Sequence, residues 1–191
     1  MEEERIKSAL ELAMERVKAL PELTPEEIAA QKEKEFGPVG ISLAMKYMSG
    51  AIAADELPSD LGRHAPDRRS VIRRALISSL CGEILAEASP ETAMKALKGI
   101  SLIAPERSEF FASVEANISG ILSEFEVEKK NRFHAFDDLA NEKLRTLGIS
   151  GSAVRPNMSE SEEWNAALDR IKQAYEPRLE SIRKNLIQEI G

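Results

Sequence analysis

The sequence predicts an all-α protein, a multi-helix bundle with a long C-terminal antiparallel helical hairpin. Along several segments, apolar residues recur at alternating spacings of three and four, which places them on one face of an α-helix. Charged residues make up 31% of the chain and aromatic residues 5%, a composition typical of long helices with solvated faces. A hydroxyl residue followed by proline and an acidic residue, a frequent helix start, occurs at Thr24 and at Ser89.

The first 57 residues are predicted to form three helices. The first covers about residues 2–20 and ends at Pro21. The second begins after Thr24 and runs to about residue 36, because glycine and proline at positions 37–40 predict a break. The third is a buried core helix that ends near residue 57. The expected apolar stripes are Ile6, Leu10, Ala13, Val17 and Leu20 for the first helix, and Ile41, Met45, Met48, Ile52 and Leu57 for the third.

The middle of the chain is predicted to hold two more helices. Residues 58–66 are expected to form a turn-rich loop, after which Asp67 caps a helix that runs to about residue 88. Within that helix, Cys81 is interpreted as a small buried hydrophobic residue and Glu83 as a partly buried carboxylate. Ser89 then caps a shorter helix that ends near residue 103.

The hairpin is predicted from two long periodic segments, about residues 105–147 and about residues 159–190, with Ser159 as the candidate cap of the second. We expect residues 1–104 to form one helical cluster and residues 105–191 the hairpin, with both parts sharing one core. The predicted seam consists of Phe111, Val114, Ile118, Ile121, Phe125, Phe133, Phe136, Ala140, Leu144 and Leu147 on the first helix, and Trp164, Leu168, Ile171, Tyr175, Leu179, Ile182, Leu186 and Ile190 on the second.

A candidate hinge interrupts this seam at Lys129 and Arg132, where apolar residues are expected. On the second helix, Pro177 predicts a kink because it removes a main-chain hydrogen bond. An antiparallel register in which facing residue numbers sum to about 308 places the two basic residues opposite residues 176–179, with Glu176 as their ion partner. A bend that wraps the hairpin around the core is the alternative to a functional hinge.

The hairpin tip, residues 148–158, is long for a connection between antiparallel helices. Gly148 suits the left-handed position that follows a helix. Two interpretations remain open for the tip, a contact with a partner or an anion and an ordered structural cap. The candidate contact residues are Ser150, Ser152, Arg155 and Asn157.

A basic cluster, residues 63–74, contains five arginines and one aspartate. Arg68 and Arg69 fall in the first turn of a predicted helix, where the helix dipole disfavours cations. Three explanations are open: pairing within the chain with Asp55, Glu56 and Asp60, an acidic partner or second subunit, and phosphate or nucleic acid. The candidate contact residues of the cluster are Arg63, Arg68, Arg69, Arg73 and Arg74.

No catalytic, cofactor or metal site is predicted. The chain has one cysteine and two histidines, and neither histidine has a second at the spacing that metal sites use. No serine lies in a nucleophile elbow. The net charge of −7 argues against bulk binding of nucleic acid or anionic lipid. The least charged run, residues 39–54, is too short and polar to span a membrane, and the acidic start lacks a secretory signal, so a cytoplasmic protein is expected.

The function expected from these features is a non-enzymatic helical module for protein interaction, as an adaptor or in assembly. A protein partner, self-association into a homo-oligomer, or both are expected. One alternative is a regulator or nucleic-acid-associated protein that uses residues 63–74. The other is a helical enzyme or small-molecule sensor with a pocket between the middle helices.

Overall fold

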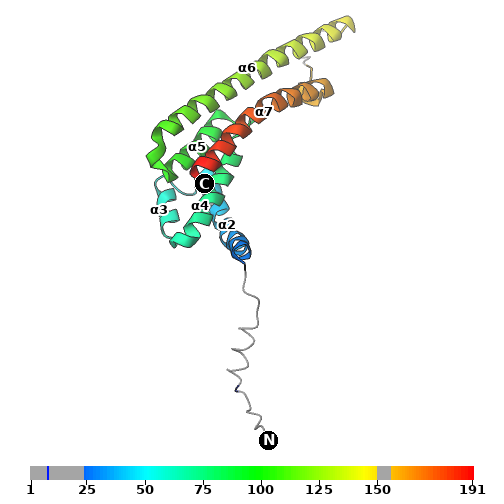
Figure 1. Cartoon of the computed structure of the whole chain (residues 1–191). Helices are drawn as coiled ribbons and strands as arrows, with labels where there is room; N and C mark the ends of the chain where they lie inside the picture. The colour runs from blue at the N-terminus through cyan, green and yellow to red at the C-terminus, as the bar shows by residue number, and fades with distance from the viewer. Residues whose placement is uncertain (1–7, 9–23, 150–155) are drawn as a thin grey trace. The chain divides into compact units, whose positions relative to one another are not determined.

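The computed structural model describes residue 8, residues 24–149 and residues 156–191, except for the side chain of Ser159. Its contacts divide the chain into two units, Met1–Glu35 and Phe36–Gly191. The described residues form six α-helices and no strand (Figure 1), which confirms the all-α prediction. The helix predicted over residues 2–20 lies outside the described residues.

Helices α2 to α6 follow one another through short connections, and α6 and α7 are each preceded by a 3₁₀ turn. Proline occupies the first position of α2, α4 and α5, where its missing N–H costs no helical hydrogen bond. The bounds are Pro25–Ser49 (α2), Glu56–Gly62 (α3), Pro66–Gly82 (α4), Pro90–Ile103 (α5), Ser108–Thr146 (α6) and Glu162–Ile190 (α7), with 3₁₀ turns at Pro105–Arg107 and Met158–Glu160.

The helix break predicted at residues 37–40 is wrong, because α2 runs without interruption to Ser49. Pro38 lies on the exposed side of α2, where solvent can reach the carbonyl group that it leaves unpaired. Gly40 is buried, and a Cβ atom there would overlap the carbonyl oxygen of Ile72 on α4. The glycine therefore permits a close helix–helix approach instead of ending the helix.

The buried face of α2 also differs from the prediction. Gly40, Leu43 and Tyr47 face the core, whereas Ile41 and Met45 are 47% and 66% exposed. Because α4 packs against the glycine, the face that carries Gly40 turns inward and the predicted positions Ile41 and Met45 turn outward. The rest of the predicted stripe contacts the core, since Met48 and Ile52 pack against it and Leu57 is fully buried.

The chain between α2 and α4 forms a helix where a loop was predicted. Helix α3 occupies the first part of the predicted loop, residues 58–66, and begins two residues before it. Helix α4 ends at Gly82, not near residue 88, and Ala65 occupies the N-cap without a side-chain hydrogen bond, so the predicted Asp67 cap is wrong. Glu83 is exposed, not partly buried. Cys81 is buried as predicted, and burial raises the pKa of its thiol to about 12.

Helix α5 matches its prediction. Its bounds agree with the sequence pattern, and the Ser89 hydroxyl accepts a hydrogen bond of 3.1 Å from the Thr92 amide at the N-terminus. Tyr47 of α2 donates a hydrogen bond of 3.0 Å to the carbonyl of Lys95. The short α5 is thus held both by its own cap and by α2.

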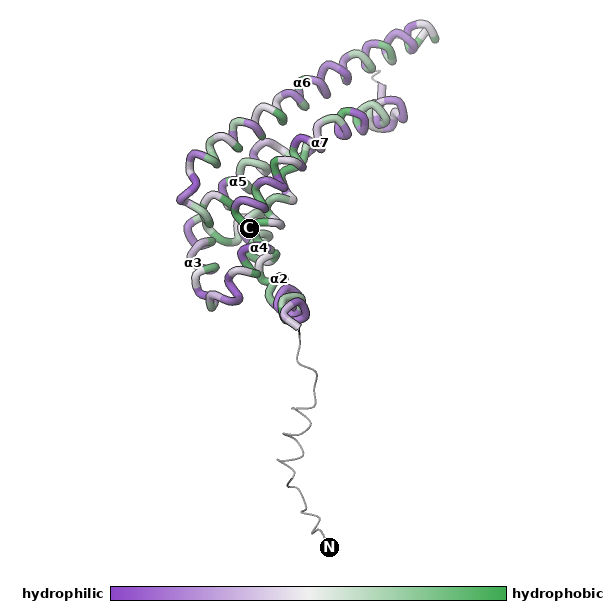
Figure 2. The backbone as a smooth tube through the Cα atoms, viewed as in Figure 1, coloured by the Kyte–Doolittle hydropathy of each residue, from purple (hydrophilic) through white to green (hydrophobic). Residues whose placement is uncertain are grey.

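The core of residues 36–191 is one cluster of buried side chains drawn from all six helices. Figure 2 shows apolar residues gathered where α4, α5 and the C-terminal part of α7 meet, whereas hydrophilic residues prevail on the far half of α6. Residues before and after position 104 both contribute to this cluster. Its largest fully buried side chains are Phe125, Leu57, Ile72, Leu76, Ile77, Leu80, Ile84, Ile100, Ile118, Leu179, Leu186 and Cys81.

Helices α6, of 39 residues, and α7, of 29 residues, form the predicted antiparallel pair. Their register differs from the prediction, since the facing pairs Glu128–Tyr175 and Glu124–Arg178 have residue numbers that sum to 303 and 302. Trp164 packs against Phe136, with ring centroids 6.1 Å apart, and not against Leu144.

The C-terminal end of α6 therefore extends beyond the start of α7 (Figure 1). Leu147, placed in the seam by its spacing, is 73% exposed. The predicted seam is too long at this end. In the observed register the first residue of α7 lies opposite a point before the last turn of α6, so α7 does not cover that turn.

Candidate functional site: a groove along helix α6

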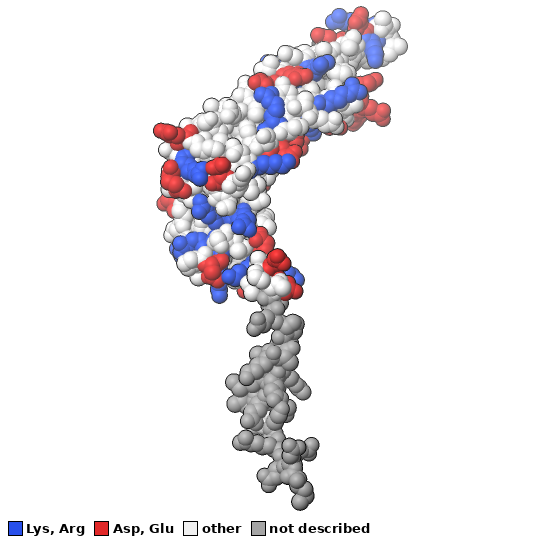
Figure 3. Space-filling view, in the orientation of Figure 1, with Lys and Arg blue, Asp and Glu red and all other residues white. Residues whose placement is uncertain are grey.

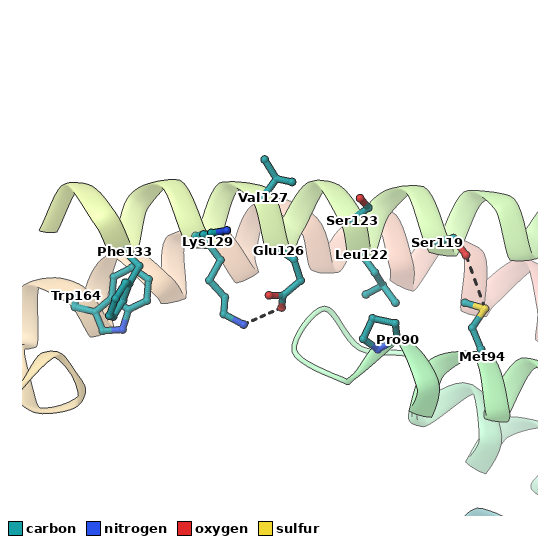
Figure 4. A pocket seen from close by; sticks show the side chains of 11 residues that line it. Pro90, Met94, Ser119, Leu122, Ser123, Glu126, Val127, Lys129, Phe133 and Trp164 are labelled. Carbon is teal, nitrogen blue, oxygen red and sulfur yellow. Dashed lines mark hydrogen bonds and ion pairs between the residues drawn. The ribbon is translucent and has the colours of Figure 1, made fainter. Parts of the chain in front are cut away.

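A groove with a volume of about 650 Å³ runs along one side of α6. Figure 4 shows that Phe133 and Trp164 close one end, Pro90 and Met94 close the other, and Val127 and Ser123 stand at the rim. We call this site the α6 groove. Its lining residues are Pro90, Met94, Ser119, Leu122, Ser123, Glu126, Val127, Lys129, Lys130, Phe133 and Trp164.

An aromatic pair forms one end of the groove. The rings of Phe133 and Trp164 meet edge to face with centroids 5.2 Å apart, an arrangement that favours aromatic packing. Trp164 is placed by the start of α7, where its amide donates a hydrogen bond of 3.2 Å to the hydroxyl of Ser161. The N-cap of α7 is therefore Ser161 and not Ser159 as the sequence suggested.

The other end of the groove is built by the start of α5. Pro90 is the first residue of that helix, and Met94 follows one turn later. The Ser119 hydroxyl of α6 donates a weak hydrogen bond of 3.9 Å to the Met94 sulfur. Because Ser119 and Phe133 are 14 residues apart on one helix, the groove is about 21 Å long.

The charged lining residues differ in whether they have an ion partner. Glu126 and Lys129 form an ion pair of 2.8 Å, and the Lys129 ammonium also lies 5.6 Å from the centre of the Phe125 ring. Lys130 is exposed and makes no ion pair with any residue that the structure describes. Val127 is an exposed apolar residue of the lining, with 57% of its surface accessible.

Helix α7 holds the connection that leads into Pro90. The two carboxylate oxygens of Glu176 accept hydrogen bonds from the Ala86 amide, at 3.1 Å, and from Arg183, at 2.6 Å. Arg183 also donates to the carbonyl of Ile84 at 3.0 Å. Lys172 pairs with Glu87 at 2.6 Å. These contacts, which we call the α7 clamp, fix residues 84–87 and so position one end of the groove.

The observed ion pairs differ from those predicted for the candidate hinge. Glu176 pairs with Arg183, whereas Lys129 pairs with Glu126 and Arg132 lies 4.0 Å from Glu128. Helix α7 continues through Pro177 without interruption. The predicted pairing failed because the register places Glu124 and Glu128, not Glu176, between the two hairpin helices.

Two polar contacts join the hairpin helices near their middle. The Tyr175 hydroxyl donates to Glu128 at 3.0 Å, and burial, with a smaller effect of this hydrogen bond, raises the pKa of Tyr175. Arg178 donates to Glu124 at 2.6 Å, and this hydrogen bond lowers the pKa of the Glu124 carboxyl. The hydrogen bond from Lys172 likewise lowers the pKa of Glu87.

Acidification is expected to weaken the hairpin through these carboxylates. The folded-state pKa of Glu87 and of Glu124 lies below the ordinary value of 4.5, so the unfolded chain binds more protons. Their contribution is fully present above that value and is lost as the pH falls through the lowered pKa. Urea unfolding between about pH 6 and pH 3 checks this. Glu124→Gln should show a shallower loss of stability than the wild type, and identical slopes would contradict the assignment.

The arginine cluster does not form one continuous face. Arg69 and Arg73, four residues apart, share one side of α4, whereas Arg68 and Arg74 lie on other sides. Arg63 pairs with Asp60 at 2.6 Å, and the Arg68 guanidinium lies 5.0 Å from the centre of the Phe36 ring.

Carbonyl groups at the end of α3 compensate for the position of Arg69 in the first turn of α4. Its guanidinium donates to the carbonyls of Gly62, at 2.9 Å, and His64, at 2.8 Å, and the C-terminus of a helix attracts cations. Glu56, one of the expected carboxylate partners, instead accepts from the Ala53 amide at 2.7 Å. The contact role of the cluster stays a prediction.

The hairpin tip lies partly outside the described residues, including Ser150, Ser152 and Arg155. Gly148 has a φ angle of +75°, which confirms the left-handed position predicted after α6. Asn157 is exposed and precedes the 3₁₀ turn Met158–Glu160. The role of the tip in binding stays a prediction.

Sequence reasoning missed the α6 groove. Among the groove residues on α6, the only apolar ones outside the predicted hairpin seam are Leu122 and Val127. These two apolar residues were the one feature of the sequence that could have indicated a second apolar face on this helix. Among residues 24–149 and 156–191, no group of three or more acidic, histidine or cysteine side chains is placed to hold a metal ion. None of the described helices has the length and apolar character needed to cross a bilayer.

The lining of the groove carries charges of both signs, since it includes Glu126, Lys129 and Lys130. On the face of the molecule drawn in Figure 3, acidic and basic side chains are likewise interspersed along α6 and α7, without a large area of one sign. Such a surface does not favour a polyanion as the general partner. Comparisons with protein-family models, with curated proteins and with solved structures find no match for this chain.

Proposed function

We propose that this chain is a non-enzymatic protein-interaction module that binds an amphipathic helix of a partner protein in the α6 groove. The observation that carries the proposal is an apolar groove about 21 Å long, bounded by Trp164 at one end and Met94 at the other. A helix of about 14 residues has the same length. Helices that dock in grooves insert apolar side chains at successive turns.

The polar lining favours a helix over a small molecule. Small-molecule pockets usually contain a few buried polar groups that converge on the ligand. Here Ser119, Ser123, Glu126 and Lys130 are all exposed, as expected for the rim of a protein interface. Met94 lines one end of the groove. Methionine is a flexible, polarisable contact for apolar side chains, so it suits the apolar face of a bound helix.

The sole tryptophan of the chain, Trp164, provides the measurement. Tryptophan-free peptides of about 16 residues, with leucine at helical spacing, would be titrated while Trp164 emission and peptide anisotropy are recorded. The wild type should bind these peptides and not scrambled peptides of equal composition. Val127→Asp should weaken binding at least about tenfold, because an apolar side chain buried in a complex contributes about 1.5–3 kcal/mol.

Leu139→Asp is the matched control. Leu139 is also an exposed apolar residue of α6, at 56%, but it does not line the groove. Its replacement should leave peptide affinity unchanged, and circular dichroism should show both variants folded. Equal affinity for scrambled peptides, or equal weakening by the two substitutions, would refute the proposal. Concentration-dependent dimers that Val127→Asp alone abolishes would show that a second copy of the chain occupies the groove instead.

A further inference from the structure

We infer that the helix bound in the α6 groove is acidic, with carboxylates along the flank beside Lys130. This inference rests on the proposed function and specifies the chemistry of the partner. It rests on the charge of Lys130, which has no ion partner among the residues that the structure describes.

The lining of the groove carries a net positive charge although the chain as a whole carries −7. Two lysines and one glutamate line it, and Lys129 already neutralises Glu126 through their 2.8 Å pair. Lys130 has no ion partner among the residues that the structure describes. A carboxylate on the bound helix would compensate this charge, whereas a lysine there would repel it.

Three peptides with one apolar face test the sign of the partner's charge. Their flanking residues would be glutamate, glutamine or lysine, and the glutamate peptide should bind about two- to fivefold more tightly than the glutamine peptide, as expected for one exposed ion pair. Added salt should remove the difference. Lys130→Glu should reverse the order of the glutamate and lysine peptides. Lys143→Glu, at an exposed position of α6 that does not line the groove, should leave the order unchanged.

Equal binding of the three peptides would overturn the acidic preference while leaving the proposed function intact. If no peptide binds, both the preference and the proposed function are overturned.

Discussion

Gly40→Ala is expected to lower the free energy of unfolding by about 3 kcal/mol, because the new methyl group meets main-chain atoms that cannot move independently. The added Cβ atom would overlap the Ile72 carbonyl oxygen and lie 2.8 Å from the Leu76 amide nitrogen. Relief requires α2 and α4 to separate. The gain in helix propensity from alanine, about 1 kcal/mol, offsets only part of this cost.

Gly120→Ala is the matched control, since Gly120 also lies inside a long helix. No atom beyond its own helical turn lies within 4 Å of the position that a Cβ atom would take, so alanine should raise the free energy of unfolding by up to about 1 kcal/mol. Urea unfolding followed by circular dichroism measures both variants. Unchanged stability of Gly40→Ala would show that α2 does not pack closely against α4.

Glu176→Ala is expected to cost about 2–3 kcal/mol by removing the centre of the α7 clamp. Its carboxylate joins the Ala86 amide to Arg183, and the Arg183 side chain is only 17% exposed. The substitution leaves a largely buried cation without its carboxylate partner and a main-chain amide without its acceptor. Chemical unfolding at neutral pH provides the measurement.

The two roles of Glu176 can be separated with a second variant. Glu176→Gln keeps an oxygen acceptor for Ala86 and loses only the charge, so its stability should fall between those of the wild type and Glu176→Ala. Glu124→Ala removes an exposed ion pair with Arg178 and should have a much smaller effect. If Glu176→Ala cost no more than Glu124→Ala, the clamp would not be a stabilising element.

Local sequence signals predicted the elements whose boundaries depend on nearby residues. Helix α5 begins after Ser89 and ends at Ile103 as expected, because a hydroxyl cap and a proline act within one turn of the chain. The buried hairpin residues Phe111, Ile118 and Phe125 also match their spacing. Helical periodicity alone identifies such a face when one neighbour covers it.

Non-local contacts decided which face of α2 is buried. Here the sequence offers two opposing features, an apolar stripe through Ile41 and Met45 and a small face at Gly40. The structure buries the small face because the α4 backbone approaches it directly. A spacing rule that counts only apolar residues gives no weight to a glycine, and it therefore selected the wrong face.

The hairpin register also depends on contacts between distant residues. Trp164 packs against Phe133 and Phe136, whereas the expected partner Leu144 lies about two turns further along α6. Several alignments bury the same apolar stripes of two long helices. The alignment adopted is the one in which the aromatic rings meet, and periodicity within each helix does not distinguish it from the others.

The sequence by itself determined that this protein is helical, where most of its helices lie and that it ends in a long hairpin, because periodicity and capping are local properties. Only the tertiary structure decided which α2 face is buried, how α6 and α7 are aligned, and that Pro90, Val127 and Trp164 line one groove. Those features arise from close packing between segments far apart in the chain, and spacing within one helix carries no information about them.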